Sequence, residues 1–350
     1  MTPCILSLTE EELTAELALL GHKAYRARQI REWVWRRRAR SFDAMTDLPP
    51  LLRKALGARF TLRPSEVVEL AGSGGGTRKF LSRMEDGSLV ESVLIPAAEG
   101  KGGMRAERLT LCVSSQVGCA FGCKFCASGL QGLERNLSAG EILGQIVTAE
   151  DIAGARIDNI VFMGMGEPLA NFDNLRQALE IILSSGALNI GARHITVSTS
   201  GNVPGLKRLT DYGRPIRLAV SLHGVTDAVR SRIMPVNRRW PLGKLIPALK
   251  DWCAASSHKI TLEYILIEGI NDTLGEAELL AGIARDLRAK VNLIPYNTVD
   301  SLPWKRPSEK QCRSFCRLLV SRRIPVTLRY EKGHDINAAC GQLRLRKLKE

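Results

Sequence analysis

From about residue 108 the chain alternates short apolar runs with longer amphipathic runs. The apolar runs are RLTLCVSS, NIVFMGMG, HITVSTSG, IRLAVSLHG, KITLEYILIEG and KVNLIPYN. Segments with helical spacing, such as SAGEILGQIVTAEDIA and NFDNLRQALEIILSSG, lie between them. These alternations predict parallel strands joined by crossover helices, and the six units are fewer than the eight of a closed barrel. We therefore expect an open, partial (β/α)6 barrel over 108–343, with its site at the carboxyl ends of the strands.

The pattern before this repeat is helical over residues 1–62. Thr9 and Glu12 form the Thr-x-x-Glu capping pattern of a helix start. A second helix is predicted over about 23–40, where three apolar residues fall on one face: Ile30, Trp33 and Val34. We expect a small helical N-terminal domain.

Residues 63–107 change to the pattern of strands. VVELAG, TRKFLSRM and SLVESVLIP are joined by Gly-rich and Asp-Gly turns. We expect a short β-rich connecting segment here, and a basic tail over 344–350. The fold class predicted is thus α/β.

Charge adds a candidate partner. The chain has 50 Lys and Arg against 36 Asp and Glu, a formal net charge of +14, which indicates a polyanionic partner such as RNA. The predicted helix over 23–40 is rich in arginine, and we take five of its residues as RNA-binding candidates: Arg28, Arg31, Arg36, Arg37 and Arg38. Trp33 and Trp35 would pack or stack beside them. The alternative is a solvated basic face.

The lengths of the apolar runs and the N-terminal sequence indicate where in the cell the protein is located. No run reaches the roughly 18 to 20 residues of a membrane helix. The N-terminus lacks the basic-then-apolar order of a signal peptide, so we expect a cytoplasmic protein. There, nine cysteines indicate metal ligands, redox thiols or core residues rather than a disulfide framework.

The most specific chemical signal is a cysteine triplet, Cys119-x3-Cys123-x2-Cys126, directly after the first strand of the repeat. Closely spaced thiolates in one loop are typical ligands of an iron–sulfur cluster. Three of them on a four-iron cluster leave one iron open, as catalytic metal sites do. The alternative is a zinc site completed by a ligand from elsewhere.

Several further motifs recur together with this triplet. SSQVGC, ASGLQGLERNLSAGEI, MGMGEPLANFDN, VSTSG, VSLHG, LIPYN and DINAACGQL occur in this order. With them the chain resembles the RlmN/Cfr family of radical S-adenosylmethionine (SAM) adenosine methyltransferases over most of residues 5–343. The resemblance implies one [4Fe-4S] cluster, whose open iron binds SAM, and a 5′-deoxyadenosyl radical formed from SAM.

The resemblance also implies a two-cysteine mechanism, because the ring carbons of adenine are poor nucleophiles. Cys340 would take a methyl group from one SAM, and a second SAM would supply the radical that activates it. Cys112 would then attack the sulfur of Cys340, release the product and leave a transient disulfide. Glu91 would accept the ring proton. For either cysteine the alternative is a small buried core residue.

The SAM contacts implied by the resemblance follow successive strands. They are Gly166, Glu167, Ser198, Ser221, Leu222, His223 and Asn297. A lone histidine such as His223 is otherwise a hydrogen-bonded structural residue.

The resemblance implies 23S rRNA and tRNA as substrates, methylated at carbon 2 of adenine. Cfr-like methylation at carbon 8, which gives antibiotic resistance, is the alternative, and CAFGCKFC is closer to Cfr. A flavodoxin or ferredoxin would donate electrons, and we expect a monomer. Two other classes remain: a non-catalytic iron–sulfur or zinc RNA-binding module, and a radical SAM activase acting on protein.

Other positions carry weaker expectations. Cys312 and Cys316, four apart on a helical pattern, could form a metal pair, but we expect packed or half-exposed residues. Cys4 and Cys253 show no partner signal. Near Cys340, Gly333-His334-Asp335-Ile336-Asn337 departs from the Gly-x-Asp-Ile-Asp pattern common in relatives through Asn337, which affects loop positioning more than chemistry; the effect of His334 is left open.

Overall fold

The computed structural model describes residues 2–72, 76–97, 108–297 and 302–329, together with residues 344 and 347. Its centre is one sheet in the order β1-β2-β3-β4-β7-β8-β9-β10-β11-β12. The strands are β1 Ser65–Ala71, β2 Arg78–Met84, β3 Leu89–Pro96, β4 Leu109–Cys112, β7 Asn159–Phe162, β8 Ile195–Thr199, β9 Arg217–Ser221, β10 Thr261–Leu266, β11 Lys290–Pro295 and β12 Val326–Leu328. All neighbours from β4 to β12 are parallel, which confirms the predicted partial barrel.

The parallel part differs from the prediction by one strand, since seven parallel strands lie within the described residues rather than six. The additional strand is β12, which pairs with β11 through Val326 opposite Val291. It is short, half-exposed and followed by no described crossover helix, so it lacks the full strand–helix rhythm that marked the other units.

The predicted connecting strands extend the same sheet. β1, β2 and β3 form an antiparallel meander, and β3 pairs with β4 through Val93 opposite Cys112. Residues of the connecting segment therefore reach the mouth of the barrel, which we define as the carboxyl ends of the parallel strands.

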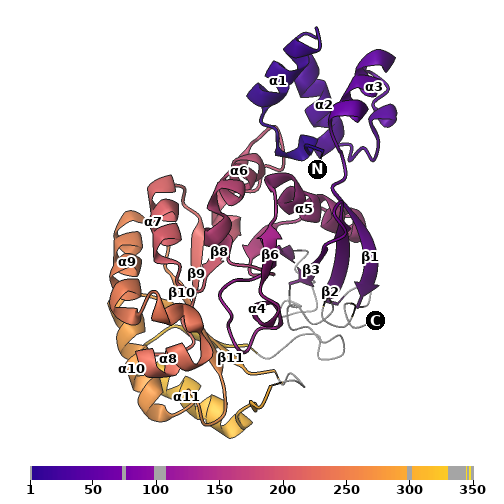
Figure 1. Cartoon of the computed structure of the whole chain (residues 1–350). Helices are drawn as coiled ribbons and strands as arrows, with labels where there is room; N and C mark the ends of the chain where they lie inside the picture. Colours follow the sequence, from indigo (N-terminus) through magenta and orange to yellow (C-terminus); the bar gives the residue numbers. More distant parts are fainter. Residues whose placement is uncertain are drawn as a thin grey trace, which may run out of the picture.

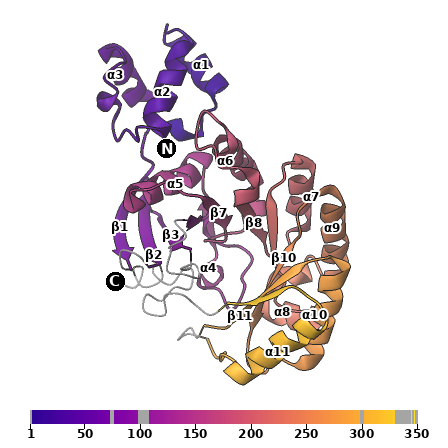
Figure 2. The ribbon, with the colours of Figure 1, turned by 180° about the vertical axis from the view of Figure 1, so that it is seen from behind.

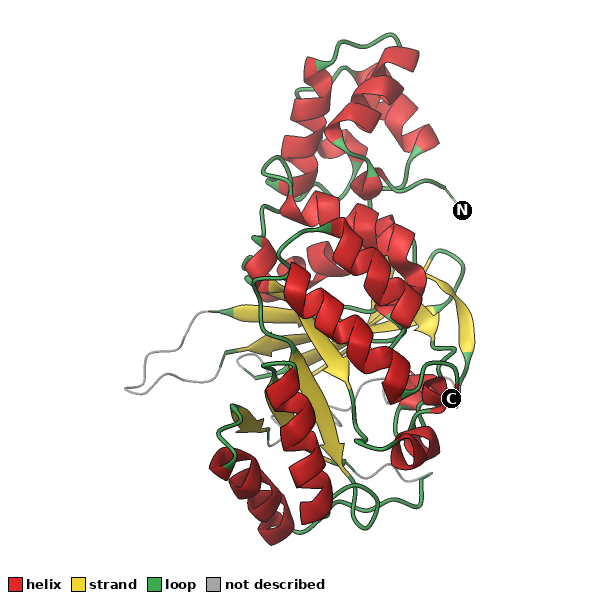
Figure 3. Ribbon diagram, turned by 90° about the vertical axis from the view of Figure 1, so that its left-hand side faces the viewer, coloured by secondary structure: helices red, strands yellow, loops and turns green. Residues whose placement is uncertain are grey.

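Helices cover the outside of the curved sheet (Figure 3). They are α5 Ala139–Ala153, α6 Phe172–Leu183, α7 Val203–Tyr212, α8 Asp227–Ile233, α9 Leu242–Ala255, α10 Leu274–Asp286 and α11 Glu309–Ser321. α5 begins with a capping box between Ser138 and Glu141 and ends at the left-handed Gly154. Strand and helix side chains share one continuous apolar core.

The N-terminal residues form a separate helical lobe beside α5 and α6 (Figures 1 and 2). Its elements are η1 Ile5–Ser7, α1 Glu10–Leu19, α2 Tyr25–Trp35, η2 Phe42–Ala44 and α3 Pro50–Arg59. The capping box of Thr9 and Glu12 is confirmed.

The second helix is shorter than the sequence predicts, because α2 ends at Trp35. The chain turns back at Arg38, whose φ is 54°, and buried Ala39 donates its N–H to the carbonyl of Trp33 at 2.9 Å. Arg36, Arg37 and Arg38 therefore lie beyond the helix rather than on its face.

Two predicted RNA contacts instead hold the lobe to the barrel, and for them the prediction is wrong. Arg31 is 5% exposed and donates to the Ser184 hydroxyl at 3.2 Å. Arg38 forms an ion pair with Glu150 of α5. Only Arg28, Arg36 and Arg37 of the five candidates are exposed.

Of the two alternatives for Trp33 and Trp35, packing or stacking, the structure shows packing. Trp35 is buried, and Trp33 donates to Asp47 while Arg37 covers its ring at 4.3 Å. Among the described helices none is long and apolar enough to cross a bilayer.

Candidate functional site

The cysteine triplet lies in a loop that starts at the carboxyl end of β4. A small hairpin, β5 Gln116–Gly118 and β6 Leu133–Asn136, holds the two ends of the loop together. Gly118 has φ of 76°, and a Cβ there would lie 1.9 Å from the carbonyl oxygen of Gly132, so only glycine permits this close pairing. The loop and its short helix α4, Ala127–Leu130, lie at the centre of the mouth (Figure 1).

The three thiols are close and shielded from solvent. Cys119 and Cys123 are buried and Cys126 is half-buried. Burial raises the pKa of Cys119 to about 12 and also raises that of Cys123. Glu167 and Cys126 raise the pKa of Cys119 further, and Cys126 and Cys119 raise that of Cys123. Such thiols ionise readily only beside positive charge, which bound metal supplies.

Three thiols in one loop are the ligand type of an iron–sulfur cluster, in which each thiolate binds a different iron. Among the described residues, no group of three Cys, His, Asp or Glu side chains is positioned to hold a single metal ion.

A buried arginine stands beside this loop. Arg230 of α8 is 0% exposed and donates to the carbonyls of Leu222 at 3.1 Å and Ser200 at 2.5 Å and to Asn237 at 2.8 Å. No carboxylate among the described residues lies within ion-pair distance of it. Burial lowers its pKa to about 10, and the Cys123 thiolate is the first charge that opposes this shift.

The turn after β7 approaches the cluster hairpin very closely. Gly166 has φ of 96°, and a Cβ there would lie 2.5 Å from Cβ of Gln116. The side chain of Gln116 accepts the N–H of Glu167 at 2.8 Å. This turn therefore presents bare backbone at the mouth.

The Glu167 carboxylate is directed at the neighbouring turn. It accepts the N–H of Ser200 at 2.7 Å and that of Leu169 at 3.4 Å, and burial raises its pKa to about 7. The side chain thus fixes the turns after β7 and β8 to each other, and Ser198 near the end of β8 is half-buried beside them.

His223 follows β9 and is held as a neutral ring. Its Nδ1 accepts the N–H of Ile265 at 3.0 Å, so the proton of the neutral ring is on Nε2. Burial lowers its pKa to about 3. Its ring meets Phe125 of the cluster loop edge-on at 4.9 Å between centroids. Both interpretations of this residue therefore apply in part, since Nδ1 is structurally bonded and the ring faces the cluster loop.

The remaining predicted SAM contacts also lie at strand ends. Ser221 and Leu222, after β9, use their carbonyls to accept Arg230. Asn297 follows β11, and its Oδ1 is buried with no hydrogen-bond partner among the described residues. A buried, unpartnered amide oxygen fits a polar ligand such as SAM.

Glu91 of β3 lies in a buried charge cluster. Its Oε2 is 3.4 Å from Nζ of Lys79, and its Oε1 accepts the backbone N–H of Arg344 at 2.6 Å. Because Val93 faces Cys112 across the strand pair, Glu91 and Cys112 share one face of the sheet as diagonal neighbours. Such neighbours are roughly 7–8 Å apart.

Arg344, in the predicted basic tail, lies at the site. It is 2% exposed, and its guanidinium contacts Gln131 at 2.7 Å and pairs with Glu134, both beside the cluster loop. Cys340, His334 and Asn337 lie outside the described residues.

The remaining cysteines are packing residues, as expected. Cys312 is buried, Cys316 and Cys253 are half-buried, and Cys4 packs against Gly140 of α5, where a Cβ would lie 2.4 Å from its own. Sequence reasoning missed Lys79, Arg230 and Arg344. The only signal for them was a charged residue within or beside an apolar run.

Comparison with known proteins decides the family. Residues 113–278 match the radical SAM superfamily, and residues 4–62 match the ribosomal RNA large subunit methyltransferase N-terminal domain. The chain is 64% identical, over 99% of its length and 97% of the relative, to a probable dual-specificity RNA methyltransferase RlmN of Akkermansia muciniphila. The chain belongs to the RlmN family. A second RlmN, from Anaeromyxobacter sp. (strain Fw109-5), is 44% identical over 97% of this chain and 90% of its own.

A solved structure agrees with this membership. A radical SAM methyltransferase from Sphaerobacter thermophilus superposes with a TM-score of 0.91 at 44% identity, covering 97% of this chain and 98% of its own. As a radical SAM protein, this RlmN-family chain is an enzyme that uses a [4Fe-4S] cluster and SAM. The buried thiols, the bare turn at Gly166 and the unpartnered Asn297 fit these two groups.

Proposed function

We propose that this chain methylates carbon 2 of one adenosine in 23S rRNA and of the adenosine next to the anticodon in tRNAs. The observation that carries the proposal is sequence similarity over nearly the whole chain, at 64% and 44% identity, to proteins named dual-specificity RNA methyltransferase RlmN. The same identity disfavours a non-catalytic binding module and a protein activase.

Three cysteines are proposed as the cluster ligands: Cys119, Cys123 and Cys126. When bound, the cluster and SAM together supply a 5′-deoxyadenosyl radical. The protein's own part is to shield this centre and to orient SAM. For the orientation we propose the seven strand-end residues described above, Gly166, Glu167, Ser198, Ser221, Leu222, His223 and Asn297. Neutral His223 would donate from Nε2, and Asn297 would accept through Oδ1.

Cys340 is proposed as the carrier of the methyl group. It lies outside the described residues, yet Arg344, four positions later, contacts Glu91 and the cluster loop. The match of AACGQL to the family motif and the position of Arg344 at the mouth support the assignment.

Cys112 is proposed as the resolving thiol and Glu91 as the proton acceptor. After the carbon of methyl-Cys340 has bonded to adenine, Glu91 would take the ring proton. The Cys112 thiolate would attack the sulfur of Cys340 and break its bond to carbon; the carbon would leave with the bonding electron pair and take a proton to become the methyl group, and a Cys112–Cys340 disulfide would remain. An external reductant would supply two electrons to restore both thiols. Lys79 beside Glu91 would stabilise its carboxylate.

Three further statements belong to the proposal. The exposed Arg28, Arg36 and Arg37 of the N-terminal lobe would contact RNA. A flavodoxin or ferredoxin would donate electrons to the enzyme, which we expect to act as a cytoplasmic monomer. The helical, connecting and barrel units would correspond to residues 1–62, 63–107 and 108–343.

The test is a denaturing gel of labelled RNA with single variants. Cys112→Ala should trap RNA covalently on Cys340, whereas Cys340→Ala and the double variant should trap none. Cys253→Ala, which removes a half-buried thiol outside the site, should release methylated RNA like the wild type. Free product from Cys112→Ala at the wild-type rate would refute the two-cysteine mechanism.

Mass spectrometry of RNA from a deletion strain then tests the substrates. Loss of 2-methyladenosine from both 23S rRNA and tRNA is expected. Loss of 8-methyladenosine instead would establish the Cfr-like alternative.

A further inference from the structure

The edge of the sheet opposite the mouth carries a row of positive charge. We call this edge, where the parallel strands begin, the rear face. All seven parallel strands within the described residues begin at, or within three residues after, an exposed cation: Arg108, Arg156, Arg193, Arg217, Lys259, Lys290 and Arg323. Neighbouring strands are about 4.8 Å apart, so these cations follow one another over roughly 25–30 Å.

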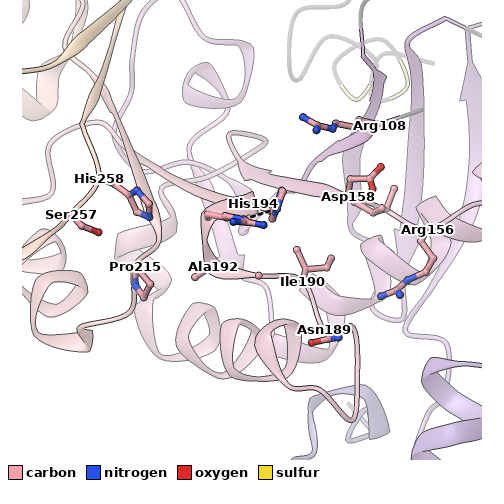
Figure 4. A pocket seen from close by; sticks show the side chains of 13 residues that line it. Arg108, Arg156, Asp158, Asn189, Ile190, Ala192, His194, Pro215, Ser257 and His258 are labelled. Atoms are coloured by element: carbon pink, nitrogen blue, oxygen red, sulfur yellow. Dashed lines mark hydrogen bonds between the residues drawn. The ribbon is translucent and has the colours of Figure 1, made fainter. Parts of the chain in front are cut away.

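Two hollows lie in this row. The first, of about 750 Å³, is lined by Arg108, Arg156, Arg193, His194 and His258, among others (Figure 4). The only acid in its lining is Asp158, which accepts the backbone N–H of Leu109 at 2.7 Å.

The second hollow, of about 560 Å³, begins at Lys259, the residue after His258. Its lining has five cations and no acid, and the cations are Lys259, Arg285, Arg288, Arg322 and Arg323. The first and second hollows therefore form one basic surface.

Several of these cations have no compensating acid. Arg322 is paired with Glu278. In contrast, no carboxylate of the described ranges lies within ion-pair distance of Arg108, Arg193, Arg288 or Arg323. Their charge is thus available to an external anion.

The backbone adds an independent observation. Arg288 and Arg323 have φ of 49° and 60°, directly after the caps of α10 and α11. α5 and α7 place Gly154 and Gly213 at their left-handed ends, as the geometry favours. Arginine at such a position is less favourable for the fold than glycine.

The helix dipole does not explain why arginine rather than glycine occupies these two positions. A cation near a helix C-terminus is favourable from any position of the last turn. For α10 that position is already occupied by Arg285. The strained arginines therefore point to a use outside the fold.

We propose that the rear face binds backbone phosphates of the substrate RNA, remote from the adenine at the mouth. This inference rests on the proposed function for its RNA. The length of the row suits a polyanion rather than a single small anion, which would need donors converging on one point. A third hollow lies between the rear face and the N-terminal lobe; its lining includes Arg36, Arg38, Arg40 and Arg156 together with the acids Glu150 and Asp151, which pair with Arg38 and Arg40. The RNA would thus contact the lobe and the rear face together.

The test is the double variant Arg288→Gly/Arg323→Gly in the cluster-loaded enzyme. Affinity is measured over a salt series for a long 23S rRNA fragment and for a minimal hairpin that carries the target adenine. Two fewer phosphate contacts should lower affinity for the long RNA roughly tenfold and flatten its salt slope by about 1.5. Hairpin affinity should not change, and the thermal midpoint should stay equal or rise.

The matched control is Lys207→Gln/Arg317→Gln, which removes the same charge from exposed positions on α7 and α11. It should leave the slope unchanged. Unchanged long-RNA affinity and slope in the glycine variant, or an equal loss in the control, would overturn the inference. Failure of the wild-type enzyme to methylate either RNA would instead refute the proposed function.

Discussion

The two ends of the same parallel strands have opposite chemistry. At the mouth, three charged groups are deeply buried: Glu167, Arg230 and Glu91 are each at most 3% exposed, and all are bonded to neighbouring turns or side chains. At the rear face, charge is plentiful, positive and exposed, as with Arg193 and Arg323.

The difference separates two tasks of one enzyme. Radical chemistry requires groups fixed in a site without water, where each charge has a large effect. Binding a long polyanion requires many cations that remain hydrated and move freely until contact. Changes at the mouth should therefore affect stability and the cluster, while changes at the rear face should affect salt-dependent affinity.

The largest expected effect is at the mouth, in Cys123→Ala. Removal of one of three proposed ligands should abolish cluster binding and reduce methylation to background. Iron content and visible absorbance of anaerobically reconstituted protein measure this. Cys316→Ala, which removes a half-buried thiol from α11, should retain both. Full iron content in Cys123→Ala would disprove the ligand assignment.

Arg230→Met should be the next largest change. It leaves carbonyls of two strand ends without their donor, which should lower the free energy of unfolding by about 3 kcal/mol. Loss of the cation should also move the cluster midpoint potential to more negative values. Urea unfolding of cluster-free protein and an EPR redox titration of loaded protein measure the two effects.

Arg230→Lys is the matched control, because it keeps the positive charge and loses the planar guanidinium with its several N–H donors. It should lose stability but shift the potential less than Arg230→Met. Equal potentials in all three proteins would show that Arg230 acts on the fold alone.

A smaller effect is expected from pH. The pKa of His223 is lowered to about 3 by burial, so between pH 3 and 6.5 the unfolded chain binds one more proton at this residue. This residue should therefore contribute a loss of stability as pH falls below about 6.5, about 2 kcal/mol at pH 5, whereas the raised pKa of Glu167 acts in the opposite direction between about pH 7 and 4.5. Urea unfolding of cluster-free wild type and His223→Gln at several pH values measures the contribution as the change in their difference with pH. His258→Gln, at the rear face, should leave it intact.

The smallest effect on stability is expected at the rear face. Arg193→Gln should change the free energy of unfolding by at most about 0.5 kcal/mol, since the side chain is exposed. It should still weaken binding of long RNA at low salt. A stability loss comparable with that of Arg230→Met would remove the distinction between the two ends.

Local signals in the sequence predicted much of this fold. The capping box at Thr9 and the apolar strand runs depend on neighbours a few residues away, and both are found. Burial of a charged side chain depends instead on distant partners. Arg31 bonds Ser184, 153 positions away, and Arg344 bonds Gln131, 213 positions away. One sequence alone could not distinguish these arginines from the exposed ones.

The contact between Glu91 and Arg344 joins residues 253 positions apart. A ribosome adds about 5–20 residues per second, so Glu91 is synthesised roughly 10 to 50 s before its partner. The sheet around Glu91 and the cluster loop can form during that interval, but the mouth still lacks the contacts of Arg344 with Glu91 and Gln131. Catalytic competence is therefore withheld from the nascent chain until Arg344 has been synthesised.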